Sequence, residues 1–292
     1  MSKIQEKFYL AGRAAIVTGG AGLLGAEFCR TLAEAGAAVV VADLAAESAA
    51  RVAESLARSG CRAIPVSADV TDPASARAMV EAALDTFGRL DILVNSAALD
   101  PKFDPQHIEE QEIGEKGAGD REAPLPSSPY SLTFENYPLE MWNKALDVNL
   151  TGMFLSCQAA VKPMLAQGRG VIVNICSMYG LVGPDQRLYQ REGQPQRYKP
   201  VYYSVTKAGV LGLTRYLATY YAGKNIRVNA LTPGGVYNGH EEAFLQAYSA
   251  RAVLGRMAEK DEMNGALLFL ASDASSYMTG ANLVVDGGWT AW

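Results

Sequence analysis

The chain has 292 residues, of which 49% are hydrophobic and 20% are charged, enough apolar material for a sizeable core. Its formal net charge is −5 and it has no block of Lys or Arg, which argues against a nucleic-acid-binding protein. No apolar run approaches the roughly 18 residues of a membrane span, so we expect no membrane partner either.

Cysteine and histidine usage predicts neither a metal site nor a disulfide framework. Four widely separated cysteines form no CxxC pair: Cys29, Cys61, Cys157 and Cys176. Only two histidines, His107 and His240, accompany them, and we expect His107 to be a surface residue. The first residues, MSKIQEKFYLAGR, lack the pattern of a signal peptide. A cytoplasmic protein with reduced thiols is the simplest interpretation.

In the first hundred residues, short apolar runs alternate with helical stretches. RAAIVTGG, AAVVVADL, CRAIPVSADV and LDILVNSAA each predict a buried strand. Between these runs we expect helices over residues 23–35, 47–59 and 73–88. Such alternation is typical of a parallel sheet with helices on both faces, and right-handed crossovers make that sheet doubly wound.

The pattern breaks over residues 100–138, which contain six prolines, and resumes in the second half. There we expect one long helix through PLEMWNKALDVNLTGMFLSCQAAVKPMLAQG, then a strand at GVIVNICS. A polar segment at 181–200 leads to a helix over 203–222 and the strand IRVNALTPGG. Helices around 243–250 and 260–272 and the strand NLVVDGG complete the chain. We therefore predict an α/β Rossmann fold with seven parallel strands in a single domain, residues 1–292, whose two insertions border the substrate cleft.

The glycine-rich turn TGGAGLLG lies between the first predicted strand and the first helix. Glycine allows a close backbone approach to a pyrophosphate, and the following helix directs its free amides toward it. Asp43 ends the second strand, 18 residues after Gly25, where an acid would hold a ribose hydroxyl. A carboxylate repels a 2′-phosphate, and no Arg or Lys lies in the turn or directly after Asp43. The sequence therefore favours NAD over NADP.

The segment VYYSVTK contains two adjacent tyrosines and a lysine. Tyr203 and Lys207 are four residues apart, so they share one face of a helix. Tyr202 points about 100° away, and its own partner is Thr206. A nearby ammonium lowers the pKa of a phenol, so Tyr203 could exchange a proton with an alcohol or carbonyl. Taken alone, such a pair is usually an ordinary surface contact.

Several motifs stand in order along the chain: TGGAGLLG, ADL, ADVTD, NSAA, DVNLTG, Ser177, YSVTK, PGG and VDGGW. With them, nearly the whole chain resembles the short-chain dehydrogenase/reductase family. The resemblance implies that Tyr203 is the general acid/base, and that Lys207 lowers its pKa and holds the nicotinamide ribose. It also implies that Ser177 hydrogen-bonds the substrate oxygen and that Asn149 supports a proton-relay water.

The resemblance also implies a cofactor site, with Asp69 and Val70 at the adenine, Asn95 lining the cleft and Val236 near the carboxamide. The implied cofactor-binding residues are Gly19, Gly22, Leu24, Gly25, Asp43, Leu44, Asp69, Val70, Asn95, Ala97, Tyr203, Lys207, Pro233, Gly234, Val236 and Asn238. The TGxxGxxG spacing is similar to that of the extended members of the family. Those members carry a substantial C-terminal substrate domain, so the classical architecture fits this chain better.

The distance from Ser177 to Tyr203 is 26 residues, about twice the usual family spacing. The inserted stretch carries Arg187, Arg191, Arg197 and Lys199, and we name Arg187, Tyr189 and Arg197 as candidate substrate residues. Such a loop would lie at the mouth of the active site and suit a polar or anionic substrate. The alternative is a solvated loop whose charges serve solubility.

DQRLY, KPVYYSVTK, LTRYLATYYA and PGGVYNG look similar to short-chain dehydrogenases of bacterial flagellin-glycosylation and nonulosonic-acid pathways. The leading hypothesis is therefore an NAD-dependent dehydrogenase of a sugar, amino sugar, sugar phosphate or polyol. One alternative is a 3-oxoacyl-type reductase, which would need NADP and a basic patch for its carrier protein. Another is a non-catalytic NAD-binding protein. The family implies a homodimer or homotetramer, with the helices around 138–166 and 203–222 as contacts.

Overall fold

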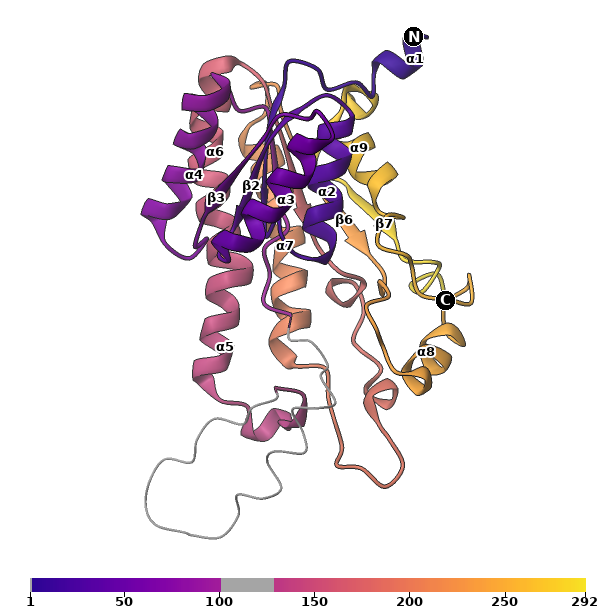
Figure 1. Cartoon of the computed structure of the whole chain (residues 1–292). Coiled ribbons are helices and arrows are strands. Elements are labelled where there is room, and N and C mark those ends of the chain that lie inside the picture. The colour runs from indigo at the N-terminus through magenta and orange to yellow at the C-terminus, as the bar shows by residue number, and fades with distance from the viewer. Residues whose placement is uncertain (1, 101–128) are drawn as a thin grey trace.

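The computed structural model describes residues 2–100 and 129–292, and these residues build one layered α/β structure (Figure 1). In this part of the chain, seven strands form a parallel sheet in the order β3-β2-β1-β4-β5-β6-β7. Their bounds are β1 Ala14–Thr18, β2 Ala38–Asp43, β3 Ala63–Ser67, β4 Ile92–Asn95, β5 Gly170–Ile175, β6 Ile226–Pro233 and β7 Asn282–Val285. The predicted doubly wound Rossmann fold is confirmed.

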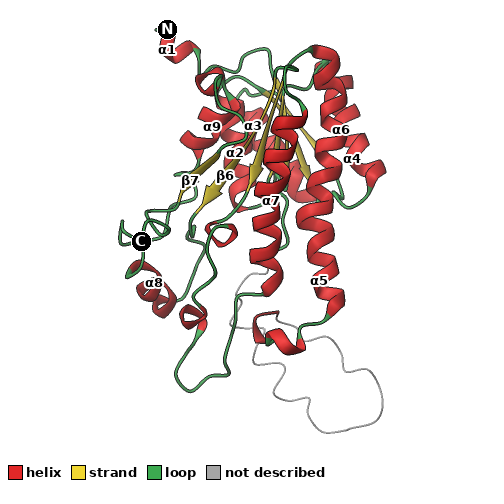
Figure 2. Ribbon diagram, turned by 180° about the vertical axis from the view of Figure 1, so that it is seen from behind, coloured by secondary structure: helices red, strands yellow, loops and turns green. Residues whose placement is uncertain are grey.

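Helices cover both faces of the sheet (Figures 1 and 2). Their bounds are α1 Lys3–Glu6, α2 Leu23–Glu34, α3 Ala46–Arg58, α4 Pro73–Phe87, α5 Leu139–Leu146, α6 Gly152–Gln167, α7 Val201–Tyr220, α8 Glu242–Ser249 and α9 Asn264–Ala271. One core cluster packs α4, α6 and α7 on one face, and a second packs α2, α3 and α9 on the other. Neighbouring strand residues alternate between the two cores, as Ile16 and Val17 do, because side chains on a strand point to opposite faces.

Local signals explain where several helices begin and end. Asp72 caps α4 by accepting hydrogen bonds from the amides of Ala74 and Ser75, and Pro73 occupies the first helical position. Gly88 ends the same helix in the left-handed conformation, with φ +74°. These capping residues are visible in the sequence, which is why the predicted and observed bounds of α4 agree within one residue.

Two helices in the second half differ from the prediction. The long predicted helix is divided by a π turn at Asp147–Thr151, which separates α5 from α6. The last helix begins at Asn264 instead of 260, because Glu262 accepts a hydrogen bond from the amide of Glu259 and pairs with Arg256. These bonds stabilise a turn where the sequence pattern predicted a helix.

Beyond the carboxyl ends of the strands, a third apolar cluster gathers side chains from loops and short helices. It includes Tyr130, Tyr179, Tyr189, Tyr248 and Trp289. The second insertion contributes the 3-10 turn η6, Gln186–Tyr189, to this cluster. Residues 101–128 of the first insertion, with His107, lie outside the described residues. Among the helices that the structure describes, none combines the length and hydropathy of a membrane span.

Candidate active site

The strand order reverses between β1 and β4, and ligands of open α/β sheets bind outside the carboxyl ends of the strands at such a point. The Thr18 hydroxyl joins the two strand ends there by accepting hydrogen bonds from the amides of Ser96 and Ala97 at 3.2 and 3.3 Å. The glycine turn begins at the next residue. The site is therefore assembled on a part of the sheet that is rigidly connected.

Glycine is required at two positions of the turn. Gly19 has φ +65°, and a Cβ there would lie 2.8 Å from the Cα of Ala97. A Cβ on Gly25 would lie 1.9 Å from the carbonyl oxygen of Gly19. Gly22 precedes α2 and provides no side-chain cap, so the first amides of this helix have no side-chain acceptor. Free amides at a helix N-terminus, approached by bare glycine backbone, suit a pyrophosphate.

Asp43 connects the end of β2 to this turn. Its Oδ2 accepts a hydrogen bond from the amide of Ala21 at 3.0 Å, and its Oδ1 accepts one from the amide of Ala45 at 3.0 Å. The carboxylate is therefore held beside the glycine turn, where the sequence placed it.

A hollow of about 250 Å³ adjoins the turn between α2 and α3, and Arg30 and Arg51 line it together with Ala21. These cations could not be expected beside the turn from the sequence, because they come from the two helices.

The other cofactor candidates of the first half differ in exposure. Leu44 follows β2 and is 72% exposed, and Asp69 is exposed after β3. Val70 is buried against Gly152, where a Cβ would lie 2.6 Å from the Val70 Cγ2. Leu24 packs against the core formed with α2, α3 and α9. An exposed apolar side chain at the end of β2 is consistent with an adenine-binding position.

Asn95, which we predicted to line the cofactor cleft, has a buried side chain. It is 1% exposed, and its Nδ2 donates to the Asn174 Oδ1 at 2.9 Å and to the Cys157 Sγ at 3.2 Å. Asn174 in turn donates to the Thr214 Oγ1 at 2.9 Å. This chain of buried amides connects β4, β5 and α7 beneath the site, so the role of Asn95 is to support the sheet.

The remaining cofactor candidates follow β6. Pro233 ends the strand, and a Cβ on Gly234 would lie 2.7 Å from the Cα of Asp286, so the two segments approach closely. Val236 forms an isolated bridge with Ala258. Asn238 is exposed, and its amide donates to the His240 Nδ1 at 3.2 Å.

The two adjacent tyrosines of α7 have different environments. Tyr202 is 1% exposed and packs edge-on against Tyr137, with ring centroids 6.1 Å apart. Tyr203 is only partly buried and packs against the apolar cluster above the sheet. The Ser177 side chain, two residues beyond β5, lies beside the Tyr203 phenol and lowers the pKa of that group. The structure therefore brings Tyr203 and Ser177 together and directs Tyr202 into the core.

Lys207 shares the helix face of Tyr203, with its Nζ 5.8 Å from the centroid of the Tyr203 ring. Lys207 is 5% exposed, and its Nζ donates to the carbonyl oxygen of Ile175 at 3.0 Å, at the end of β5. Burial lowers the pKa of this ammonium. A Cβ on Gly180 would lie 2.7 Å from the Lys207 carbonyl carbon, so this glycine allows the loop after β5 to pack tightly on α7.

A second lysine, Lys199, lies closer to Tyr203 than Lys207 does. Its Nζ is 3.9 Å from the centroid of the Tyr203 ring, 2.6 Å from the Asp100 Oδ1 and 3.4 Å from the Tyr130 hydroxyl. Sequence reasoning named Lys199 only as one charge of the insertion. Lys199 precedes Pro200, the N-cap of α7, so helical spacing could not reveal its contact with Tyr203.

Electrostatics at Tyr203 are mixed. Burial is the main cause that raises the pKa of the phenol, and the Asp100 carboxylate raises it further. Lys199 and the hydrogen bond with Ser177 lower it. Proton exchange near neutral pH therefore depends on the cations around this ring and on any charge that a bound cofactor adds.

Asn149 lies in the π turn between α5 and α6 and is 2% exposed. Its Oδ1 accepts from the Leu99 amide at 2.6 Å, and its Nδ2 donates to the Thr206 Oγ1 at 3.1 Å and to the Leu99 carbonyl at 3.3 Å. Thr206 donates to the Tyr203 carbonyl at 3.2 Å. Asn149 thus connects the segment after β4 to the turn of α7 that carries Tyr203, and Thr206 is a supporting residue that the sequence did not reveal.

The three predicted substrate residues do not act together. Arg187 is exposed and pairs with Asp185 at 2.8 Å, so its role at the substrate stays a prediction. Arg197 is 8% exposed, and burial lowers its pKa while Glu241 raises it. Tyr189 is 6% exposed, and its hydroxyl lies 3.3 Å from that of Tyr179.

Tyr189 belongs to an aromatic wall near Tyr203. Its ring centroid lies 5.8 Å from that of Tyr130 and 5.7 Å from that of Phe244. His240 stacks on Phe244 at 5.1 Å. Rings of this kind offer flat apolar faces, and their hydroxyls provide a few polar contacts.

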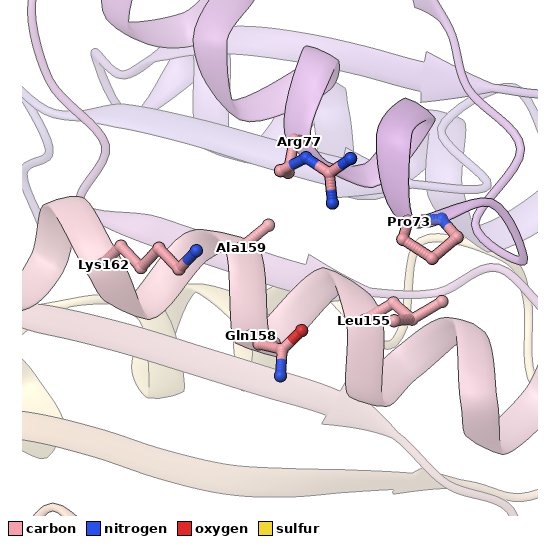
Figure 3. A pocket seen from close by; sticks show the side chains of 6 residues that line it. All are labelled: Pro73, Arg77, Leu155, Gln158, Ala159 and Lys162. Carbon is pink, nitrogen blue, oxygen red and sulfur yellow. The ribbon is translucent and has the colours of Figure 1, made fainter.

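A separate hollow between α4 and α6 is lined by Pro73, Arg77, Leu155, Gln158, Ala159 and Lys162 (Figure 3). Its volume of about 20 Å³ suffices for a single water molecule, and it contains none of the residues above. Over the described ranges, no group of three or more His, Cys, Asp or Glu side chains could hold a metal ion.

Comparison with known proteins identifies the family of this chain. A family model described as short chain dehydrogenase matches residues 13–116, and one described as enoyl-(acyl carrier protein) reductase matches residues 126–290. The chain is 38% identical over 285 residues to a cis-4-hydroxycyclohexanecarboxylate dehydrogenase of Sinomonas cyclohexanicum, covering 96% of this chain and 98% of the relative. It is 35% identical over 288 residues to a D-threitol dehydrogenase of Mycolicibacterium smegmatis, covering 97% and 95%.

A solved structure is similar over its whole length. A gluconate 5-dehydrogenase from Burkholderia cenocepacia, in complex with NADP and tartrate, has a TM-score of 0.79 and 31% sequence identity, covering 99% of each chain.

Proposed function

The chain belongs to the short-chain dehydrogenase family and acts on the CH–OH group of secondary alcohols, and from this premise we propose that Tyr203 is its general acid/base and NAD its cofactor. The observation that carries the proposal is the Tyr203 phenol, which lies beside the Ser177 side chain and has the Lys207 Nζ 5.8 Å from its ring centroid. We also infer that residues 1–292 form one domain, because β1 to β7 belong to one sheet.

The residues present fit a dinucleotide. The uncapped N-terminus of α2 and the bare backbone of Gly19 and Gly22 would hold the pyrophosphate, and Asp43 would accept hydrogen bonds from the adenine ribose. Lys207 would hold the nicotinamide ribose. When bound, the nicotinamide supplies the hydride acceptor or donor.

The chain's own residues then manage the proton. In the oxidative direction the Tyr203 phenolate accepts the hydroxyl proton of the substrate. Ser177 donates a hydrogen bond to the substrate oxygen and keeps it beside the phenol. Asn149 holds the backbone of α7 through Thr206 and keeps this geometry in place. In the reductive direction the neutral phenol returns the proton to the forming alkoxide.

We propose a sugar, amino sugar, sugar phosphate or polyol as the substrate, and a small alicyclic hydroxy acid as the second candidate. The aromatic wall and the buried Lys199 support both, because they combine flat apolar faces with one cation. The two classes are represented by D-threitol and cis-4-hydroxycyclohexanecarboxylate, the compounds that appear in the names of the two relatives. Flagellin-glycosylation and nonulosonic-acid pathways remain a finer prediction within the amino-sugar class.

The cofactor proposal has a specific competitor. Asp43 favours NAD, whereas Arg30 and Arg51 line a hollow beside the same turn and offer positive charge to a 2′-phosphate. The solved gluconate 5-dehydrogenase was crystallised with NADP. NAD is preferred here because the Asp43 carboxylate is bonded directly to the turn.

The alternative of a 3-oxoacyl-type reductase stays testable. The alternative of a non-catalytic NAD-binding protein is set aside, because the chain is a dehydrogenase.

The decisive experiment is a substrate panel followed by absorbance of reduced nicotinamide. The panel contains D-glucose, D-glucosamine, D-glucose 6-phosphate, D-threitol, gluconate, cis-4-hydroxycyclohexanecarboxylate and, in the reverse direction, an acetoacetyl thioester. Turnover of the thioester alone would overturn the substrate proposal, and an equal rate with NADP would overturn the cofactor proposal.

A further inference from the structure

Lys199 is a buried cation that directly contacts the ring of Tyr203. It is 8% exposed, and its Nζ lies 3.9 Å from the ring centroid, whereas the Nζ of Lys207 lies 5.8 Å from it. A cation within about 6 Å of an aromatic ring is attracted by it, more strongly when the cation is desolvated. Lys199 is therefore the cation nearest to Tyr203 among the described residues.

The position of Lys199 is fixed by its backbone as well as by its side chain. The Lys199 amide donates to the Gln186 Oε1 at 2.8 Å, and the Gln186 Nε2 donates to the Lys199 carbonyl at 3.4 Å. The preceding amide, of Tyr198, donates to the Tyr130 carbonyl at 2.8 Å. These bonds tie the end of the second insertion to η6 and to the turn η2, Pro129–Ser131, so the ammonium is held above the ring.

Lys207 has a different partner. Its ammonium donates to the Ile175 carbonyl at 3.0 Å, at the end of β5. Lys199 instead pairs with Asp100, whose side chain is 45% exposed, at 2.6 Å. A cation and an anion from two different loops therefore meet beside the same phenol.

We propose that Lys199 and Asp100 form a charge pair that tunes proton exchange at Tyr203, with Lys199 favouring the phenolate and Asp100 opposing it. This inference rests on the proposed role of Tyr203 as acid/base. Lys199 is a positioning residue in this scheme, because it acts through Tyr203 and not on the substrate.

The electrostatic directions agree with this geometry. After burial, which raises the pKa of Tyr203 most, Asp100 raises it and Lys199 lowers it. The other polar or titratable groups that face this region are Ser177, Tyr130, Tyr179, Tyr189, His240 and Lys207. Lys199 and Asp100 themselves carry opposite charges, so removing one or the other should produce opposite effects on the pKa of Tyr203.

The test is the pH profile of kcat/KM for oxidation of the most active alcohol of the substrate panel, at saturating NAD. Oxidation requires the phenolate, so the rate falls as the pH drops below the apparent pKa of Tyr203. Lys199→Met should move this limb by about 1–3 pH units to higher pH. Asp100→Asn should move it toward lower pH, and Lys199→Arg should keep it near the wild-type position. Lys7→Met, which removes an exposed cation next to α1, is the matched control.

Opposite displacements in Lys199→Met and Asp100→Asn support the charge pair, since a merely structural role would lower the rate without moving the limb in two directions. Unmoved limbs in both variants, with Tyr203→Phe inactive, overturn the pair and leave the proposed function intact. An active Tyr203→Phe enzyme overturns both. If Lys199→Met does not fold, the pH profile of Asp100→Asn tests the proposal alone. An acidic limb of that profile that stays in place or moves toward higher pH overturns the proposed charge pair.

Discussion

Tyr202 and Tyr203 occupy adjacent positions, yet their hydroxyls lie in different environments. Tyr202 is enclosed by core side chains and by the Tyr137 ring. Tyr203 is paired with Ser177 and has two lysines within 6 Å of its ring, Lys199 at 3.9 Å and Lys207 at 5.8 Å. A helical step of one residue therefore separates a phenol in the core from the phenol that we propose as the acid/base.

We expect Tyr203→Phe to lower kcat by about 10²–10⁴-fold, the usual contribution of general acid–base catalysis. NADH affinity should be preserved, because the ring and its packing remain. Tyr202→Phe is the matched control and should keep kcat within a few-fold. Steady-state kinetics and a fluorescence titration with NADH measure the two quantities. Similar losses in both variants would show that the phenol of Tyr203 has no special role.

Asp43 and Arg51 provide opposing charges near the glycine turn. Asp43→Ala should weaken NADH by about tenfold, since a charge-assisted hydrogen bond to the ribose is lost. The preference for NADH over NADPH should narrow, because the repulsion of a 2′-phosphate is also removed. Arg51→Ala should change NADH affinity little. Calorimetric titration with both cofactors measures the ratio, and an unchanged ratio in Asp43→Ala would assign the preference to another residue.

A π turn at Asp147–Thr151 interrupts the long helix of the second half. Such turns inside helices often occur at functional sites. It allows Asn149 to reach both Leu99 and Thr206. A regular helix was predicted for this segment, since its apolar pattern continues on both sides of the turn. The interruption depends on contacts with the segment after β4 and with α7, which are distant in the sequence.

The close packing inside the glycine turn can be tested by substitution. Gly25→Ala places a Cβ 1.9 Å from the Gly19 carbonyl oxygen, so the turn or α2 must move. We expect a lower melting temperature and a loss of NADH affinity of at least about tenfold, because the amides that face the pyrophosphate are displaced. Gly265→Ala in α9 is the control, since a Cβ there meets no atom of the described chain within 4 Å. Differential scanning fluorimetry and NADH titration separate the two variants.

Over the whole molecule, the outer surfaces of α6 and α7 carry apolar side chains. Phe154 is 46% exposed, Tyr216 60% and Tyr220 65%, and the rings of the last two stack at 5.7 Å. Exposed apolar groups of this size often mark a protein–protein contact. Their position supports the proposal of a homodimer or homotetramer that uses these long helices, as the family resemblance implied.

Phe154→Glu should therefore shift the protein toward smaller species, since an isologous contact would bring two carboxylates together in a desolvated surface. Light scattering after size exclusion measures the mass. Lys7→Gln, which makes the same change in net charge at an exposed position beside α1, is the control. If the wild-type chain is a monomer, or if Phe154→Glu keeps the wild-type mass, this surface is not the contact.

The sequence by itself determined the fold class, the alternation of strands and helices along the chain, and the candidate catalytic residues Tyr203, Lys207 and Ser177. These conclusions depend on local signals: apolar periodicity, glycine and proline positions, and helical spacing, all of which act within a few residues. Only the tertiary structure decided that Lys199 lies over the Tyr203 ring, that Asn95 supports the sheet and that Arg187 is paired with Asp185. Each of these depends on which distant segments meet, because a side chain takes its hydrogen bonds, its charge partners and its burial from neighbours in space.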